Sequence, residues 1–172
     1  MHLVMKLFFL IAAIRWGDWR NWQKYYPTIL FFILMDLFYN YLLYEYPMWE
    51  FHEGDIPVLH YEVFIVLSFI IVRYPATILI YLGNFPAGKL KSIFWITFWV
   101  LLYTIVEVID LYLGLISHHN GWNLGWSILF NVVMFLTLKI HYHKPLLAWC
   151  ISIIWILFLW NVFDIPMDVL KK

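Results

Sequence analysis

The sequence predicts an all-α fold, a polytopic bundle of transmembrane helices. Hydrophobic residues make up 65% of the 172 residues and charged residues only 13%. Because about a quarter of the residues of a soluble domain are charged, this chain has too few charges to cover a surface that faces water. The apolar residues also occur in long stretches, and a transmembrane helix needs about 20 of them in succession. The whole chain, residues 1–172, is therefore expected to form a single integral membrane domain.

Six apolar segments follow one another, and five of them are long enough to be firm spans. The first segment contains Lys6 and about a dozen apolar residues, so its helix would reach about 18 Å across a hydrocarbon core of about 30 Å. This short N-terminal helix is expected either to lie in the interface or to form a sixth span. The segments cover residues 3–15, 26–46, 57–83, 91–116, 121–139 and 145–165.

The connections between the segments alternate in charge. Those near Arg20, Lys89 and Lys144 are basic, the one between residues 45 and 55 is acidic, and the one near residue 118 has no formal charge. Lysine and arginine are enriched in loops on the cytoplasmic side of a membrane. The three basic loops are therefore expected in the cytoplasm, and the acidic loop and the C-terminus on the outer side of a plasma membrane.

The rare ionisable residues inside apolar segments point to function, because hydrocarbon forces each to face a partner, a cavity or the bundle interior. Asp36 and Arg73 lie near the middle of two successive segments, so we expect an intramembrane ion pair. Glu62 lies about three helical turns before Arg73 on the same face. The pair could be a gate or a proton-coupled switch, or it could only fix the register of two helices. Pro75, after Tyr74, should bend this helix and free a backbone carbonyl.

A second group of polar residues forms a candidate path or proton site. Glu107 and Asp110 lie one turn apart in the fourth segment, and at reduced dielectric they would not both ionise readily. This suits a proton carrier or a cation ligand. In the alternative, Asp110 reaches the outer headgroups and Glu107 bonds to a neighbouring helix. Asn123, Ser127 and Asn131 follow at intervals of four in the fifth segment, as a stripe that either lines a water path or packs against another helix.

Composition and motifs limit the cofactors and partners. The net charge is zero, which argues against nucleic acid as a partner because that needs a basic surface. His60, His118 and His119 are weak candidates for a divalent-metal site with nearby carboxylates, but no motif such as H-E-x-x-H supports them, so no metal or cofactor is predicted. Membrane lipids are the expected partners. Gly121 and Gly125 permit close approach of a helix, which leaves a second copy or another membrane protein open as a partner.

Four sequence blocks carry a resemblance to a known family: RWGDWRNWQKYYPTILFFILMDLFYNYL, YPATILIYLGNFP, HHNGWNLGWSILFN and HYHKPLLAW. They resemble an uncharacterised family of small polytopic membrane proteins from spore-forming Gram-positive bacteria, and the resemblance runs along most of the chain. It implies a bacterial plasma-membrane location and supports the number of spans. It implies no catalytic or binding residues.

Three functions are open at this point. The first is permeation or transport of a small ion or solute with proton coupling, through the intramembrane polar groups described above. The second is a non-catalytic membrane subunit or interaction protein, in which the same groups only lock helices together. The third and weakest is a lipid-modifying enzyme that uses His118 or His119 with Glu107 as an acid–base pair. A hydrated cavity that reaches Glu107 or the level of Asp36 and Arg73 would favour the first function, and a dry interior at this level would favour the second.

Overall fold

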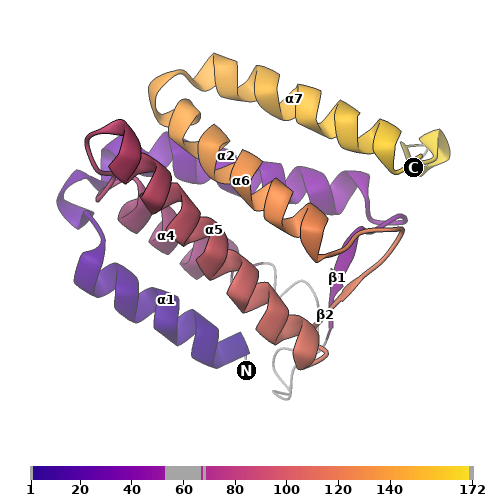
Figure 1. Cartoon of the computed structure of the whole chain (residues 1–172), viewed down its shortest axis with the longest axis horizontal. Helices are drawn as coiled ribbons and strands as arrows, with labels where there is room; N and C mark the ends of the chain where they lie inside the picture. The colour runs from indigo at the N-terminus through magenta and orange to yellow at the C-terminus, as the bar shows by residue number, and fades with distance from the viewer. Residues whose placement is uncertain (1, 53–66, 68, 171–172) are drawn as a thin grey trace.

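The computed structural model of the chain describes residues 2–52, 67 and 69–170, and most of these residues are helical (Figure 1). The all-α prediction is confirmed, with one small sheet in addition. The long helices are α1 (His2–Trp16), α2 (Trp22–Leu42), α5 (Lys89–Tyr112), α6 (Leu124–His143) and α7 (Pro145–Val162). The short helical elements are η1 (Trp19–Asn21), η3 (Phe69–Arg73), α4 (Tyr74–Tyr81) and η4 (Met167–Leu170).

Three helices of the described chain, α5, α6 and α7, are long and apolar enough to cross a membrane. Helix α2 has 21 residues, but polar residues such as Gln23, Asp36 and Asn40 lower its hydropathy, and it is not among the three. Residues 57–66 and 68 of the predicted segment 57–83 lie outside the described residues. The structure therefore supports three candidate spans, and five spans remain a prediction.

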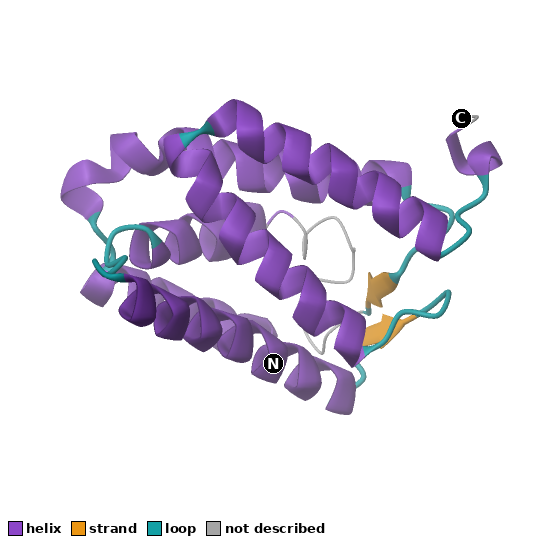
Figure 2. Ribbon diagram, turned by 45° about the horizontal axis from the view of Figure 1, so that its top comes forward, coloured by secondary structure: helices purple, strands orange, loops and turns teal. Residues whose placement is uncertain are grey.

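Helix α1 packs into the bundle. Its side chains Phe9, Ala12 and Ala13 are buried, and its contacts are with α4 and η3. Figures 1 and 2 show α1 running alongside the other helices. With 15 residues it is about 22 Å long, less than the thickness of a hydrocarbon core of about 30 Å. The N-terminal segment is thus a packed helix of the bundle that is too short to cross a bilayer by itself.

The helix of the third predicted segment changes from π-helical to α-helical geometry just before Pro75. The π-helix η3 ends at Arg73, and α4 begins at Tyr74 with Pro75 in its first turn. Proline has no N–H to donate, so the regular ladder of backbone hydrogen bonds is interrupted one turn before it. The wider π-turn occurs at this point. Such turns are rare and are often found at functional sites.

One end of the bundle carries a two-stranded antiparallel sheet, in which β1 (Trp49–Phe51) pairs with β2 (Ile116–His118). The sheet joins the chain after α2 to the chain after α5, and the Tyr46 hydroxyl donates to the carbonyl of Phe163 after α7. Figures 1 and 2 show both strands where α2 and α5 finish. We call this end, which also holds residues 163–170, the sheet end.

The opposite end gathers the three loops that the sequence predicts to be basic, and we call it the basic end. The side chain of Asn84, between α4 and α5, donates to the Trp16 carbonyl at 2.8 Å. The Lys139 ammonium lies 3.9 Å from the centre of the Phe85 ring, which brings the loop before α5 against the last turns of α6, just before Lys144. The three loops therefore lie on the same end of the bundle.

Candidate functional site

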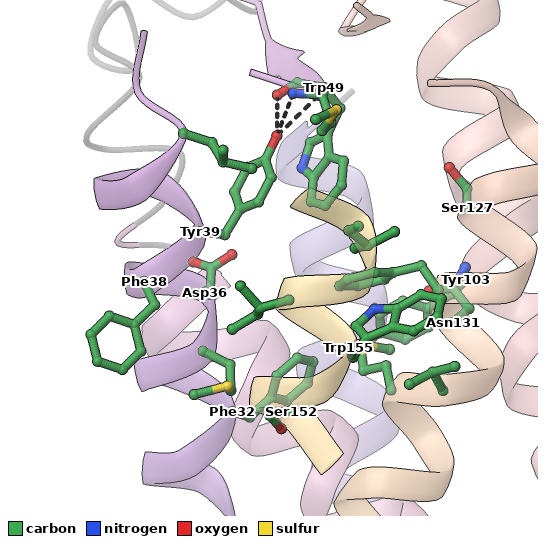
Figure 3. A pocket seen from close by; sticks show the side chains of 18 of the residues that line it. Phe32, Asp36, Phe38, Tyr39, Trp49, Tyr103, Ser127, Asn131, Ser152 and Trp155 are labelled. Carbon is green, nitrogen blue, oxygen red and sulfur yellow. Dashed lines mark hydrogen bonds between the residues drawn. The ribbon is translucent and has the colours of Figure 1, made fainter. Parts of the chain in front are cut away.

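A cavity of ≈ 260 Å³ lies between α2, α5, α6 and α7 and extends toward the sheet end. Its wall is formed by segments that are far apart in the sequence. Figure 3 shows Asp36 on one side of the cavity and Ser127 and Asn131 on the other, with Trp155 from α7 at the wall between them. Six of the polar residues singled out in the sequence line it: Asp36, Arg73, Glu107, Asp110, Ser127 and Asn131.

Asp36 reaches the cavity from α2. Its carboxylate oxygen Oδ2 is buried and has no hydrogen-bond partner in the described part of the chain. The Tyr74 side chain interacts with the same carboxylate, and the Arg73 guanidinium lies within electrostatic range of it. A direct ion pair between Asp36 and Arg73 remains a prediction, but both side chains line one cavity, as expected from their similar depth.

The Arg73 guanidinium is held against aromatic rings from two helices. Its carbon Cζ lies 4.5 Å from the centre of the Tyr103 ring on α5 and 5.4 Å from that of Phe9 on α1. A cation over the face of an aromatic ring is attracted by the ring quadrupole. The Tyr103 hydroxyl is in turn hydrogen-bonded to Thr77 Oγ1 at 2.6 Å. These contacts place the positive charge between α1 and α5, on one side of the cavity.

Asp110 is the one buried carboxylate among the described residues, with 5% of its surface exposed. Its oxygen Oδ1 has no hydrogen-bond partner among these residues, while Arg73 and Glu107 lie within electrostatic range. The alternative in which Asp110 reaches the headgroups does not agree with this burial. An acceptor that is buried without a partner is costly, so a proton, a water molecule or a ligand would be stabilised beside it.

Glu107 is the centre of a hydrogen-bond network that joins α5, β2 and α6. Its oxygen Oε1 accepts from His118 Nε2 at 2.8 Å and from the Ser127 hydroxyl. The Ser127 oxygen also accepts from Trp122 Nε1 at 2.8 Å. This carboxylate therefore has both a structural role, because it links three elements, and a place in the cavity wall.

The polar stripe on α6 divides into two parts. Ser127 and Asn131 are buried and line the cavity. Asn123 is the N-cap of α6, and its Oδ1 accepts from the backbone N–H of Gly125 at 2.9 Å and from that of Trp126 at 3.3 Å. Capping side chains satisfy backbone donors that have no partner within the helix. The contacts of Asn123 are therefore explained by its role as a cap, and this role needs no position on a transport path.

The two glycines near the start of α6 do not form a helix-packing face within the chain. Helix α6 begins at Leu124, so Gly121 precedes it with a φ of +83°. Gly125 is exposed, and a Cβ added there would approach the Asn123 side chain at 3.1 Å rather than another helix. The predicted close approach of a helix at Gly121 and Gly125 is therefore not found within the described residues.

The histidines considered for a metal site have other partners or are not described. His60 and Glu62 lie outside the described residues. His118 binds Glu107, whereas His119 Nε2 is hydrogen-bonded to Ser117 Oγ at 2.6 Å. No group of three or more His, Cys, Asp or Glu side chains in the described ranges is arranged to hold a metal ion.

Two aromatic residues that the sequence analysis did not single out form the cavity wall toward the sheet end. The rings of Tyr39 and Trp49 stack with their centres 4.0 Å apart. The Tyr39 hydroxyl accepts from the backbone N–H groups of Met48 and Trp49 and donates to the Trp49 carbonyl (Figure 3). Tyr39 follows Asp36 by three residues, and this helical spacing could have identified it.

Comparison with protein-family models, characterised proteins and solved structures gives no match for this chain. The resemblance of its sequence blocks to small bacterial membrane proteins therefore remains an expectation. What supports a function is the geometry of the cavity.

Proposed function

We propose that this protein is an integral membrane transporter for a small ion or solute, with coupling to protons. The observation that carries the proposal is the cavity of ≈ 260 Å³ at the level of Asp36, Glu107 and Asp110. A subunit that only locks helices together needs no space beside its buried carboxylates, because an unpaired buried acceptor is costly. A transporter needs such a space to hold its substrate.

The proposed setting is a bacterial plasma membrane that the chain crosses several times. Three helices have the necessary length and apolarity, and large apolar side chains such as Leu146, Ile154 and Leu157 are exposed on α7, where they would face lipid. Because basic loops favour the cytoplasmic side, the basic end would lie in the cytoplasm and the sheet end outside. The cavity would then open nearer to the outer side.

Asp110 is the residue that we propose as the proton-binding or cation-binding group. Its buried and unpartnered Oδ1 could bind either a proton or a cation, but not both. Competition between the two for one carboxylate would couple their movements in opposite directions. Arg73 would balance part of the negative charge of the cavity, and Asn131 would supply a polar wall.

Flux measurements in proteoliposomes test this function. We expect uptake of protons or of a cation above the level of empty vesicles, and a decrease of about tenfold or more in Asp110→Asn, which corresponds to about 1.4 kcal/mol in the barrier. Asp168→Asn is the matched control, because Asp168 is exposed on η4 and does not line the cavity. Equal flux in the two variants would exclude Asp110 from the path.

A lack of flux for protons, sodium, potassium and chloride, with a folded wild-type protein, would contradict transport of these ions. The function would then be that of a non-catalytic subunit or interaction protein, and its membrane partner could be identified by cross-linking at the sheet end. Asp110→Asn would have no effect on such an association unless the partner reached the cavity.

A lipid-modifying enzyme is the second candidate, and the 2.8 Å contact between His118 Nε2 and Glu107 Oε1 favours it. The Ser127 hydroxyl donates to Glu107 and not to His118, so the carboxylate, and not the imidazole, is the base placed to accept a proton from this serine. A serine nucleophile needs a base that accepts its proton. Mass spectrometry of vesicle phospholipids after incubation would detect turnover, and unchanged lipids would exclude this candidate.

A further inference from the structure

The cavity wall combines negative charge with aromatic rings. Among the described residues, the charged side chains that line it are three acids, Asp36, Glu107 and Asp110, and one base, Arg73. When all four are ionised, the guanidinium balances only one of the three carboxylates. The aromatic part of the wall includes Trp49, Tyr103, Trp122, Phe130 and Trp155.

Two carboxylate oxygens at this wall are buried and lack a hydrogen-bond partner among the described residues: Oδ2 of Asp36 and Oδ1 of Asp110. Asp110 is 95% buried, since only 5% of its surface is exposed. Glu107 differs, because its Oε1 already accepts from His118 and Ser127. Asp36 also interacts with the Tyr74 side chain, so the larger unmet capacity for binding a positively charged group belongs to Asp110, and that of Asp36 is limited to its Oδ2.

From these observations we infer that the cavity binds an organic ammonium cation, with its charge facing the acidic part of the wall that includes Asp36 and Asp110 and its apolar part against the aromatic wall. The inference deepens the proposed function and rests on it, since the cavity is the same. Aromatic faces attract ammonium groups, and quaternary ammonium groups are recognised in this way in other proteins. The cavity of ≈ 260 Å³ also has room for an apolar substituent.

A bare metal cation fits this wall less well. Hard cations such as calcium take six to eight oxygen ligands, and no group of three or more His, Cys, Asp or Glu side chains in the described chain is placed to hold a metal ion. An ammonium with organic substituents needs only a counter-charge and an apolar surface. Asp36, Asp110 and rings such as Trp155 supply both.

Binding of benzyltrimethylammonium to the full-length protein in nanodiscs tests the inference, with intrinsic tryptophan fluorescence as the readout. We expect saturable binding that weakens by about tenfold or more in Asp110→Asn and in Asp36→Asn, because each removes a counter-charge from the cavity wall. Asp168→Asn is the control and should bind like the wild type. Benzyl alcohol has the same ring without the charge, and its fluorescence response should not change between the wild type and Asp110→Asn. Thermal unfolding of each variant verifies that it is folded.

The outcomes separate the ligand class from transport. Saturable binding that depends on Asp110 supports the inference, even where proteoliposomes show no flux and the transport function fails. Flux of protons or inorganic ions without binding of benzyltrimethylammonium overturns the inference and leaves transport in place. Binding that is equal in the wild type, Asp36→Asn and Asp110→Asn also overturns it, because the probe would then occupy another apolar surface.

Discussion

Replacing Ser127 by alanine tests the hydrogen-bond network around Glu107. Ser127 is 6% exposed, donates to Glu107 Oε1 and accepts from Trp122 Nε1. The substitution removes a bond to a charged acceptor and leaves a buried indole N–H unpaired. Such losses cost about 1–3 kcal/mol in soluble proteins, whereas side-chain hydrogen bonds between membrane helices average about 0.6 kcal/mol. Because two bonds are lost together, we expect the free energy of unfolding to fall by about 1–3 kcal/mol.

Ser152→Ala is the matched control for this experiment. Ser152 is also buried, at 8% exposed, and lines the same cavity, but its hydroxyl makes no hydrogen bond within the described chain. Unfolding in mixed micelles with increasing SDS, followed by tryptophan fluorescence, gives the free energy of unfolding of each variant. We expect a change below about 0.5 kcal/mol for Ser152→Ala and partial recovery in Ser127→Thr, which keeps a hydroxyl. If Ser127→Ala and Ser152→Ala lose the same stability, the network around Glu107 does not hold the helices.

Three further substitutions test the loops and a helix cap. The Tyr25 hydroxyl donates to Asp18 at 2.7 Å and holds the pKa of that carboxyl below its usual value of 3.8. Asp18 therefore contributes to stability at pH values above 3.8, and this contribution is lost as the pH falls through the lower pKa of the folded protein. The unfolding temperature of Asp18→Asn should depend less on pH between 6 and 3 than that of the wild type. Parallel curves of unfolding temperature against pH for the two proteins would contradict this. A Cβ at Gly83 would lie in close contact with the Leu79 backbone oxygen and 2.6 Å from the Asp18 Cβ, so Gly83→Ala should destabilise the protein by about 1–3 kcal/mol. An unchanged unfolding midpoint would show that neither contact is this close. Asn123→Ala should lower the free energy of unfolding by about 1 kcal/mol, because it removes the N-cap of α6. The control is Asn161→Ala, at an exposed position. Equal stability of these two variants would exclude a stabilising role for the cap.

The positions of the long helices could be predicted because apolar residues in long runs have few alternatives to a helix in hydrocarbon. The segments 91–116, 121–139 and 145–165 correspond to α5 (Lys89–Tyr112), α6 (Leu124–His143) and α7 (Pro145–Val162). The convergence of Asp36, Glu107, Asp110, Ser127 and Asn131 followed from the same reasoning, since polar groups avoid lipid and therefore meet inside the bundle. Depth along the helices predicted one pair of neighbours, Asp36 and Arg73, and their direct contact remains a prediction.

The β1–β2 sheet could not be predicted in this way. Each strand has three residues, too few to show an alternation of apolar and polar side chains, and the pairing joins residue 49 to residue 118. It depends on the ends of α2 and α5 lying together, which is a result of the tertiary fold. The resulting network, in which Ser117 Oγ contacts Nε2 of both His52 and His119, has no signature in the sequence.

Two other residues show how local context determines a role. Asn123 lies directly before an apolar helical run, which is a signal for an N-cap, but its spacing from Ser127 suggested a stripe instead. His141 is 5% exposed, and its ring stacks on Phe31 and is hydrogen-bonded to Thr28 at 3.0 Å. The partners of His141 belong to α2, so only the packing of α2 on α6 reveals that this histidine is buried.

The hydrogen bonds of the carboxylates in the cavity wall separate residues that hold the bundle together from residues that are available to a ligand. Glu107 has partners on β2 and α6, so its geometry is explained by the fold alone. Asp110, one turn away on α5, has an oxygen that is buried and unpartnered among the described residues. Two carboxylates that look equivalent in the sequence therefore have different consequences when they are neutralised. Glu107→Gln should mainly reduce stability, because it weakens the charge-assisted bonds to His118 and Ser127. Asp110→Asn should mainly reduce binding and flux, because it removes a charge that no side chain of the described chain satisfies by a hydrogen bond.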